Sequence, residues 1–279
     1  MVVLLCVAAL VAFAANSIFT RAALAGTSID AVSFTAVRLV SGALVLWLIV
    51  LLRAAGAEGR GSWASALALF GYAIAFSLAY RSLTAATGAL LLFGAVQVTM
   101  ISWGLVRGER LSAVQWAGIL LAVAGLVGLL LPGLSPPPIG AAGLMLAAGF
   151  SWGVYTLRAK GAGDPTRVTA ANFGRAALPG VAVALAFGGN LSWDGLGLAL
   201  AVASGALASG MGYAIWYAAL KQIGTHTAAV SQLSVPVMTA IAGVVLLAEP
   251  LDWPTVIGGA CILGGIALVT RSYRMRRSD

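Results

Sequence analysis

The chain has 279 residues, of which 61% are hydrophobic and only 9% are charged, and its mean hydropathy is +1.01. Because a soluble domain carries about 25% charged residues, this composition excludes an ordinary soluble protein. The net charge of +8 does not indicate a nucleic-acid partner, because the cations lie between apolar segments, where they orient membrane proteins. We therefore expect an all-α membrane protein whose surroundings are the lipid bilayer.

Ten apolar segments follow one another along the chain, separated by short stretches with charge, proline or glycine. Each segment is long enough to cross a hydrocarbon core of about 30 Å as a helix. They cover residues 2–24, 30–52, 63–83, 86–106, 112–131, 138–158, 167–187, 195–220, 225–247 and 254–271. The runs are continuous rather than alternating, which argues against a membrane β-barrel. The sequence therefore predicts ten transmembrane helices and no soluble domain.

The distribution of lysine and arginine predicts the orientation. Of 16 such residues, Arg38 and Arg175 lie inside spans, and only Arg21 and Arg81 lie in loops on one side of the membrane. The remaining twelve lie on the other side: Arg53, Arg60, Arg107, Arg110, Arg158, Lys160, Arg167, Lys221, Arg271, Arg274, Arg276 and Arg277. Positive charge marks the cytoplasmic side, so both termini are predicted to be cytoplasmic, in a bacterial inner membrane.

The two halves of the chain carry related motifs. Gly108-Glu109-Arg110-Leu111 recurs at an offset of 140 residues as Ala248-Glu249-Pro250-Leu251, and Arg38 matches Arg175 at an offset of 137. We expect one five-helix repeat at 1–131, a proline-rich periplasmic linker at 132–137 and a second repeat at 138–279. Because five is odd, the second repeat should be inverted relative to the first, an arrangement typical of transporters with a central substrate site.

The motifs resemble those of the drug/metabolite transporter superfamily, in its ten-helix branch of EamA-like permeases. The matching stretches are Gly108–Leu111 leading into Gln115-Trp116-Ala117-Gly118, Ala248–Leu251 leading into Gly258-Gly259, and residues 92–100. The resemblance covers essentially the whole chain. It implies export of amino acids or related metabolites by alternating access. Many members carry a proline in the fourth helix, where this chain has Val96.

Catalytic and coupling groups are sparse. All eight acids lie in loops or at span ends, so no carboxylate is placed for a proton relay, and we expect a facilitative carrier. His226 is the alternative coupling group, although a structural or interfacial role is favoured for it. Glu109 and Glu249 are expected to stabilise helix starts, and Cys6 and Cys261 to be buried as small apolar residues. This set predicts neither an enzyme nor a metal or cofactor site.

Polar and aromatic residues within the spans predict a central substrate cavity. Arg38 and Arg175 lie near the midplane, where a guanidinium either binds a substrate carboxylate or hydrogen-bonds backbone carbonyls. The predicted lining consists of Trp103, Tyr80, Trp152, Tyr155, Tyr213, Trp216, Gln97, Gln232, Ser231, Asn16, Arg38 and Arg175. Rings, amides and arginines suit a neutral or aromatic amino acid.

Transport also requires places where helices bend. Gly42, Gly94, Pro179 and Pro236 are the predicted hinges, because glycine and proline weaken a helix. Small residues in the fifth and tenth spans predict close packing of these helices, either within a monomer or in a homodimer. The leading hypothesis is thus an alternating-access exporter of amino acids. Export of drugs, nucleosides or other metabolites is the alternative, and a small-solute channel is a weaker one.

Overall fold

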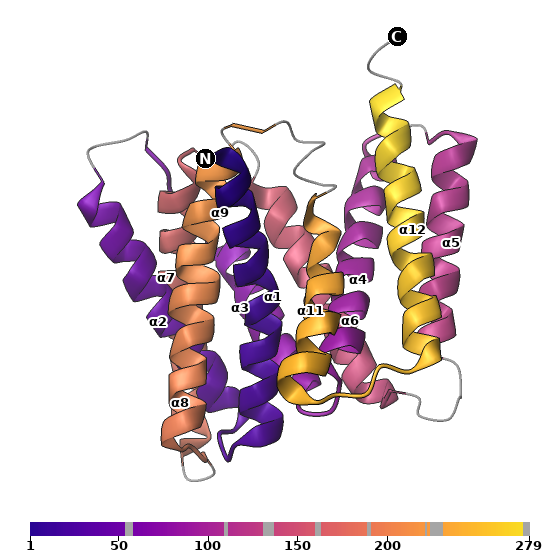
Figure 1. Ribbon diagram of the computed structural model, residues 1–279. Coiled ribbons are helices and arrows are strands. Elements are labelled where there is room, and N and C mark those ends of the chain that lie inside the picture. The colour runs from indigo at the N-terminus through magenta and orange to yellow at the C-terminus, as the bar shows by residue number, and fades with distance from the viewer. Residues whose placement is uncertain are drawn as a thin grey trace.

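The computed structural model describes residues 1–53, 58–108, 111–130, 137–159, 163–188, 191–220, 222–223 and 231–275. Within these ranges the chain forms ten helical rods (Figure 1). Nine are single helices: α1 (Val2–Gly26), α2 (Ala31–Leu52), α3 (Trp63–Tyr80), α4 (Ala85–Val106), α5 (Ala113–Leu130), α6 (Ile139–Ala159), α7 (Pro165–Ala186), α11 (Ser234–Leu247) and α12 (Trp253–Met275). The remaining rod joins α8 (Gly195–Val202), the π-helical segment η2 (Ala203–Met211) and α9 (Gly212–Leu220).

Seven of these rods are long and apolar enough to cross a membrane, and the apolar parts of α5, α11 and α12 are shorter. The predicted number of helices is therefore confirmed for the described residues. The ninth predicted span began at residue 225, whereas α11 begins at Ser234. Residues 224–230, including His226, lie outside the described residues, as do Glu109 and nearly all of the predicted linker at 132–137.

Acidic residues cap several of the helices. Asp30 accepts hydrogen bonds from the backbone N–H groups of Val32 and Ser33 at the start of α2. Asp164 and Asp194 do the same for α7 and α8. An N-cap carboxylate satisfies N–H groups that have no partner inside the helix. The expectation that the acids lie at helix ends therefore holds for these three, whose carboxylates accept hydrogen bonds from the first N–H groups of the helices.

The helices pack in pairs that bring distant parts of the sequence together. α2 packs on α7, α3 on α6, and α1 on α9 and η2; α4 contacts α6 and α11, and α11 contacts α1. α12 lies along α5 at one edge of the bundle (Figure 1). The start of α1 and the end of α12 lie at the same end of the bundle, which we call the terminal end. The opposite end is called the distal end.

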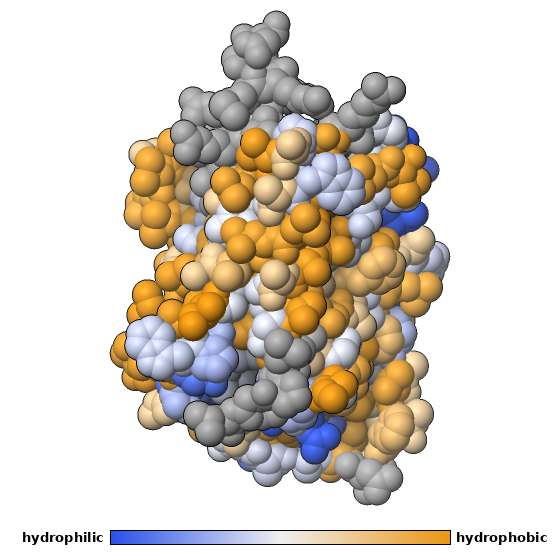
Figure 2. All heavy atoms as spheres, turned by 90° about the vertical axis from the view of Figure 1, so that its right-hand side faces the viewer, coloured by the Kyte–Doolittle hydropathy of each residue, from blue (hydrophilic) through white to orange (hydrophobic). Residues whose placement is uncertain are grey.

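Glycines let α5 and α12 approach closely. A Cβ added at Gly125 would lie 2.7 Å from Cys261 Cβ and from the Gly258 carbonyl oxygen, and one added at Gly118 would lie 2.6 Å from the Gly265 carbonyl oxygen. The predicted packing of these two helices is thus present within one chain. Apolar side chains cover most of the outer face of this pair (Figure 2), as expected of a surface in lipid.

This packing can be tested by adding volume. Gly125→Leu should lower the thermal stability of the detergent-purified protein, because overpacking a tight contact costs about 1–3 kcal/mol. Gly128→Leu is the matched control, since a Cβ at Gly128 meets nothing within 4 Å. Melting temperatures measured side by side should fall for the first variant only. Equal melting temperatures for the two variants would contradict the close approach.

The Asp30 cap should make stability depend on acidity. Burial raises the pKa of the Asp30 carboxyl, but hydrogen bonds from Ser33, Ser192 and Val32 outweigh burial and hold the pKa below its usual value of 3.8. A carboxyl with a lowered pKa in the folded state stabilises the protein at higher pH and loses that effect as the pH falls through the folded pKa.

We therefore expect Asp30→Asn to melt at a lower temperature than the wild type above about pH 5, where the carboxyl is ionised in both folded and unfolded states. The difference should shrink steadily as the pH is lowered below the usual pKa of 3.8. A difference that stayed constant across this range would show that the charge of Asp30 contributes nothing.

Candidate functional site

A buried arginine lies at the centre of the bundle. Arg38 on α2 is only 1% exposed, and its Nη2 donates a hydrogen bond of 3.0 Å to the hydroxyl of Tyr72 on α3. Its Nε and Nη1 have no hydrogen-bond partner among the described residues. The guanidinium also lies 5.1 Å from the ring centroids of Tyr72 and Phe76. No acid is bonded to it within the described part of the chain, where the ion pair present is Arg21–Glu249.

Two further polar residues hold Tyr72 in place. Asn16 on α1 donates to the Tyr72 hydroxyl at 3.1 Å, and Ser204 in η2 donates to the Asn16 side-chain oxygen at 2.8 Å. The backbone of η2 approaches α2 so closely that a Cβ at Gly205 would collide with the Arg38 carbonyl. Small residues in η2 therefore allow three helices to converge on the arginine.

Aromatic rings form one wall of this centre. Trp152 on α6 lies 4.9 Å from Tyr72 and stacks at 5.4 Å on Tyr213 and at 5.3 Å on Tyr155, measured between ring centroids. Phe173 on α7 contacts Tyr213 at 6.0 Å. The helices α3, α6, α7 and α9 each contribute a ring. Aromatic rings and a cation are thus close neighbours at this centre.

A chain of hydroxyl groups leads from these rings toward the terminal end. The Tyr155 hydroxyl lies 3.5 Å from Thr169 Oγ1, which is hydrogen-bonded at 3.1 Å to the hydroxyl of Tyr217. Tyr217 in turn lines a pocket. The hydroxyl groups therefore run from the pocket to Tyr155, whose ring stacks on Trp152.

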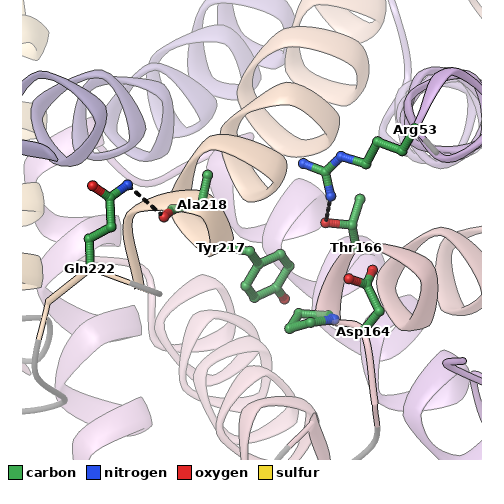
Figure 3. Close-up of a pocket in the computed structure, with 7 residues that line it drawn as sticks. Arg53, Asp164, Thr166, Tyr217, Ala218 and Gln222 are labelled. Atoms are coloured by element: carbon green, nitrogen blue, oxygen red, sulfur yellow. Dashed lines mark hydrogen bonds between the residues drawn. The ribbon is translucent and has the colours of Figure 1, made fainter. Parts of the chain in front are cut away.

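This pocket has a volume of about 280 Å³ and is formed by the end of α2, the start of α7 and the end of α9. Its lining residues are Arg53, Asp164, Pro165, Thr166, Tyr217, Ala218 and Gln222. Arg53 Nη1 donates to Thr166 Oγ1 at 2.7 Å, and Gln222 Nε2 donates to the Ala218 carbonyl at 3.3 Å (Figure 3). The pocket lies at the terminal end, and its lining includes one positively charged side chain, Arg53, and one negatively charged side chain, Asp164.

The distal end is held together by an ion pair. Arg21 Nε on α1 donates to Glu249 at 2.6 Å, and Arg21 Nη1 donates to the Tyr80 carbonyl at 3.0 Å. Glu249 also accepts from the backbone N–H of Ala85, the first residue of α4. Glu249 was expected to stabilise the start of its own following helix, but Asp252 does that. Glu249 instead ties α1 and α4 to the chain after α11.

Several predicted cavity residues lie away from the arginine. Trp103 is 45% exposed, with Arg107 over its ring. Gln97 lines a very small cavity between α4, α5 and α12. Arg175 donates to the Ala171 carbonyl on its own helix. A hydrogen bond to a backbone carbonyl was one of the two roles that the sequence suggested for this arginine.

The other members of the predicted lining differ in their surroundings. Tyr80 is buried toward the distal end, where its hydroxyl donates to the Ala85 carbonyl. Trp216 packs edge-on against Phe13. Ser231 and Gln232 are half-buried just before α11. The structure therefore brings together Asn16, Arg38, Trp152, Tyr155 and Tyr213 from the predicted set.

The predicted hinges differ in their surroundings. A Cβ at Gly42 would lie 2.7 Å from the Phe173 ring, so this glycine allows close packing of α2 on α7. Pro179 lies inside α7, where it removes one helical hydrogen bond. Pro236 lies in the first turn of α11, a position that proline tolerates without bending the helix. Gly94 faces Leu126 of α5.

The sequence did not single out three of the residues that complete this site: Ser204, Thr169 and Arg53. Their spacing gave no signal, because their contacts join residues 14 to 188 positions apart. Within the described ranges no group of three His, Cys, Asp or Glu side chains could hold a metal ion.

Comparisons with known proteins agree with this architecture. The profile of the EamA-like transporter family matches residues 1–131 and again residues 139–271. An uncharacterized protein of Pseudomonas aeruginosa is 55% identical over 267 residues, covering 95% of this chain and 93% of its own. An uncharacterized transporter of Archaeoglobus fulgidus is 31% identical over 241 residues, covering 82% of each chain.

A solved crystal structure shares the fold, with a TM-score of 0.68 and 23% identity over 98% of both chains. The fold, the match of both halves to one profile and the similarity to a transporter over most of its length point to the same identity. The chain is a membrane transporter that belongs to the EamA-like transporter family.

Proposed function

We propose that this transporter exports small amphipathic metabolites, with neutral or aromatic amino acids first among them, by alternating access in the bacterial inner membrane. The observation that carries the proposal is Arg38, a buried cation with two N–H-bearing nitrogens that lack a partner among the described residues. Burying an unpaired charge costs several kcal/mol. Such a cost is understandable where a ligand of opposite charge completes the site.

A carboxylate is the group that would satisfy these two nitrogens best. An arginine presents parallel N–H donors that match the two oxygens of a carboxylate. Tyr72 lies beside the guanidinium, and Trp152 packs on Tyr72 and stacks on Tyr213, so the surroundings of the cation are aromatic. The combination favours a solute that carries a carboxylate next to a flat apolar group, and aromatic amino acids have this form.

Two inverted five-helix repeats, 1–131 and 138–279, would explain how such a site is reached from both sides. The helix pairs support this arrangement. If each of the ten rods is replaced by the rod five places further along, returning to the first after the tenth, the contact of α3 with α6 becomes the contact of α1 with α9 and η2. In the same way, the contact of α4 with α6 becomes the contact of α11 with α1. The backbone agrees as well, because Gly108 and Ala248, which are matched at the offset of 140, both have positive φ angles, of 84° and 52°.

Alternating access requires one end to open while the other is closed. The pocket at the terminal end and the Arg21–Glu249 pair at the distal end support such a state. With both termini cytoplasmic, as the loop charges favour, the pocket faces the cytoplasm. This is the side from which an exporter takes its substrate.

The role of Arg38 can be tested by uptake of radiolabelled phenylalanine and leucine into proteoliposomes, with and without an imposed pH gradient. Arg38→Met keeps the length of the side chain and removes the charge, and it should reduce saturable uptake at least about tenfold, because a charge-assisted bidentate contact is lost. Arg175→Met is the matched variant and should retain uptake. Equal loss in both variants, with unchanged melting temperatures, would contradict a specific role for Arg38.

The role of the distal ion pair can be tested by labelling. In a background with Cys6→Ser and Cys261→Ser, Ser17→Cys places a thiol at a buried position on α1. Glu249→Gln removes the ion pair and should raise the rate of labelling by a membrane-impermeant maleimide from the periplasmic side about tenfold, which corresponds to a free-energy change of about 1.4 kcal/mol. Asp252→Asn, at the same end, is the control. An unchanged rate would show that the pair does not hold the distal end closed.

A further inference from the structure

We infer that the pocket at the terminal end is a first binding site for the zwitterionic head of an α-amino acid, separate from the central site at Arg38. This inference rests on the proposed function, because it takes the substrate class from there. The site would hold the carboxylate on Arg53 and the ammonium on Asp164, with the side chain of the amino acid against Tyr217 and Pro165.

The charges of the pocket carry the argument. Arg53 and Asp164 both line it, yet they form no ion pair within 4.0 Å, and Thr166 lies between them as the partner of Arg53. One oxygen of Asp164 accepts from the backbone N–H of Arg167 as the cap of α7. The two opposite charges are thus held near each other without neutralising each other. An α-amino acid carries its own two charges on one carbon and would satisfy both.

The surroundings of these charges suit the rest of an amino acid. Pro165, Ala218 and the ring of Tyr217 give the pocket an apolar wall, and its volume of about 280 Å³ is large enough for one such molecule. Tyr217 also begins the series of hydroxyls through Thr169 to Tyr155, which stacks on Trp152. This series of hydroxyls joins the wall of the pocket to the cluster of rings that includes Trp152 and Tyr72.

The pocket would therefore select zwitterions before the substrate reaches the centre. A carboxylate without an ammonium group would meet the negative charge of Asp164 without compensation. An amine without a carboxylate would leave Arg53 unsatisfied and repel it. The central site carries a cation and no acid among the described residues, so it cannot make this distinction by charge.

The test is equilibrium binding of radiolabelled L-phenylalanine to the purified full-length protein. In the Arg38→Met background, which removes the central site, Arg53→Gln and Asp164→Asn should each weaken binding about tenfold, the loss typical of one charge-assisted contact. Asparagine still caps a helix, so the second variant keeps the start of α7. Arg60→Gln at the same end and Asp194→Asn at another helix cap are the controls and should bind as the wild type does. Arg38→Met should retain binding at the pocket while losing transport.

Competition experiments test the selection of zwitterions. In the wild type, 3-phenylpropanoate and phenethylamine should each compete at least about tenfold more weakly than phenylalanine, and Asp164→Asn should reduce the disadvantage of 3-phenylpropanoate. Two results would overturn the inference: unchanged binding in Arg53→Gln and Asp164→Asn, or equal competition by 3-phenylpropanoate. If phenylalanine binding depended on Arg38 alone, the pocket would be excluded and the proposed function would stand. If the wild type neither bound nor transported any amino acid, both would fail.

Discussion

The structure is organised around a positive charge, Arg38, that has no acid bonded to it among the described residues. Arg38 is almost completely buried and shares the hydroxyl of Tyr72 with Asn16, while Ser204 holds Asn16 from the opposite side. In a lipid-exposed position a centred arginine would cost at least about 2.5 kcal/mol. The convergence of α1, α2, α3 and η2 on this side chain therefore has to keep it away from lipid, and the glycines at 42 and 205 make that convergence sterically possible.

The fold could be predicted from the sequence to a large extent, because membrane helices are specified by long apolar runs. The ten rods match the ten apolar segments, and Asp30 and Asp164 lie at helix starts as their position before apolar runs indicated. The exception is the middle of the eighth rod. The π-helical turn at Ala203–Met211 depends on contacts with α1 and α2, which hydropathy does not report.

The site was less predictable, because residue type and depth do not determine which way a side chain faces. Trp103 and Trp152 are equally aromatic and similarly placed in their spans, yet Trp103 is 45% exposed and Trp152 stacks on two tyrosines. Arg38 and Arg175 match in the repeat, but only Arg38 reaches the aromatic centre, whereas Arg175 bonds to its own helix. The contacts of Glu249 could not be predicted either, because its partner Arg21 is 228 positions away in the sequence.

The uncompensated charge of Arg38 also has an electrical consequence. In the alternating-access cycle proposed above, the guanidinium would experience the negative potential of the cytoplasmic side when the carrier opens inward. It would experience the positive side when the carrier opens outward. Moving one elementary charge through the full membrane potential changes the energy by about 2.3 kcal/mol per 100 mV. An energised membrane therefore favours the conformation that is open to the cytoplasm. Because a zwitterion adds no net charge, this bias would be the same for the empty and the loaded carrier. It would therefore favour the return step of the proposed export cycle and oppose the export step to the same extent.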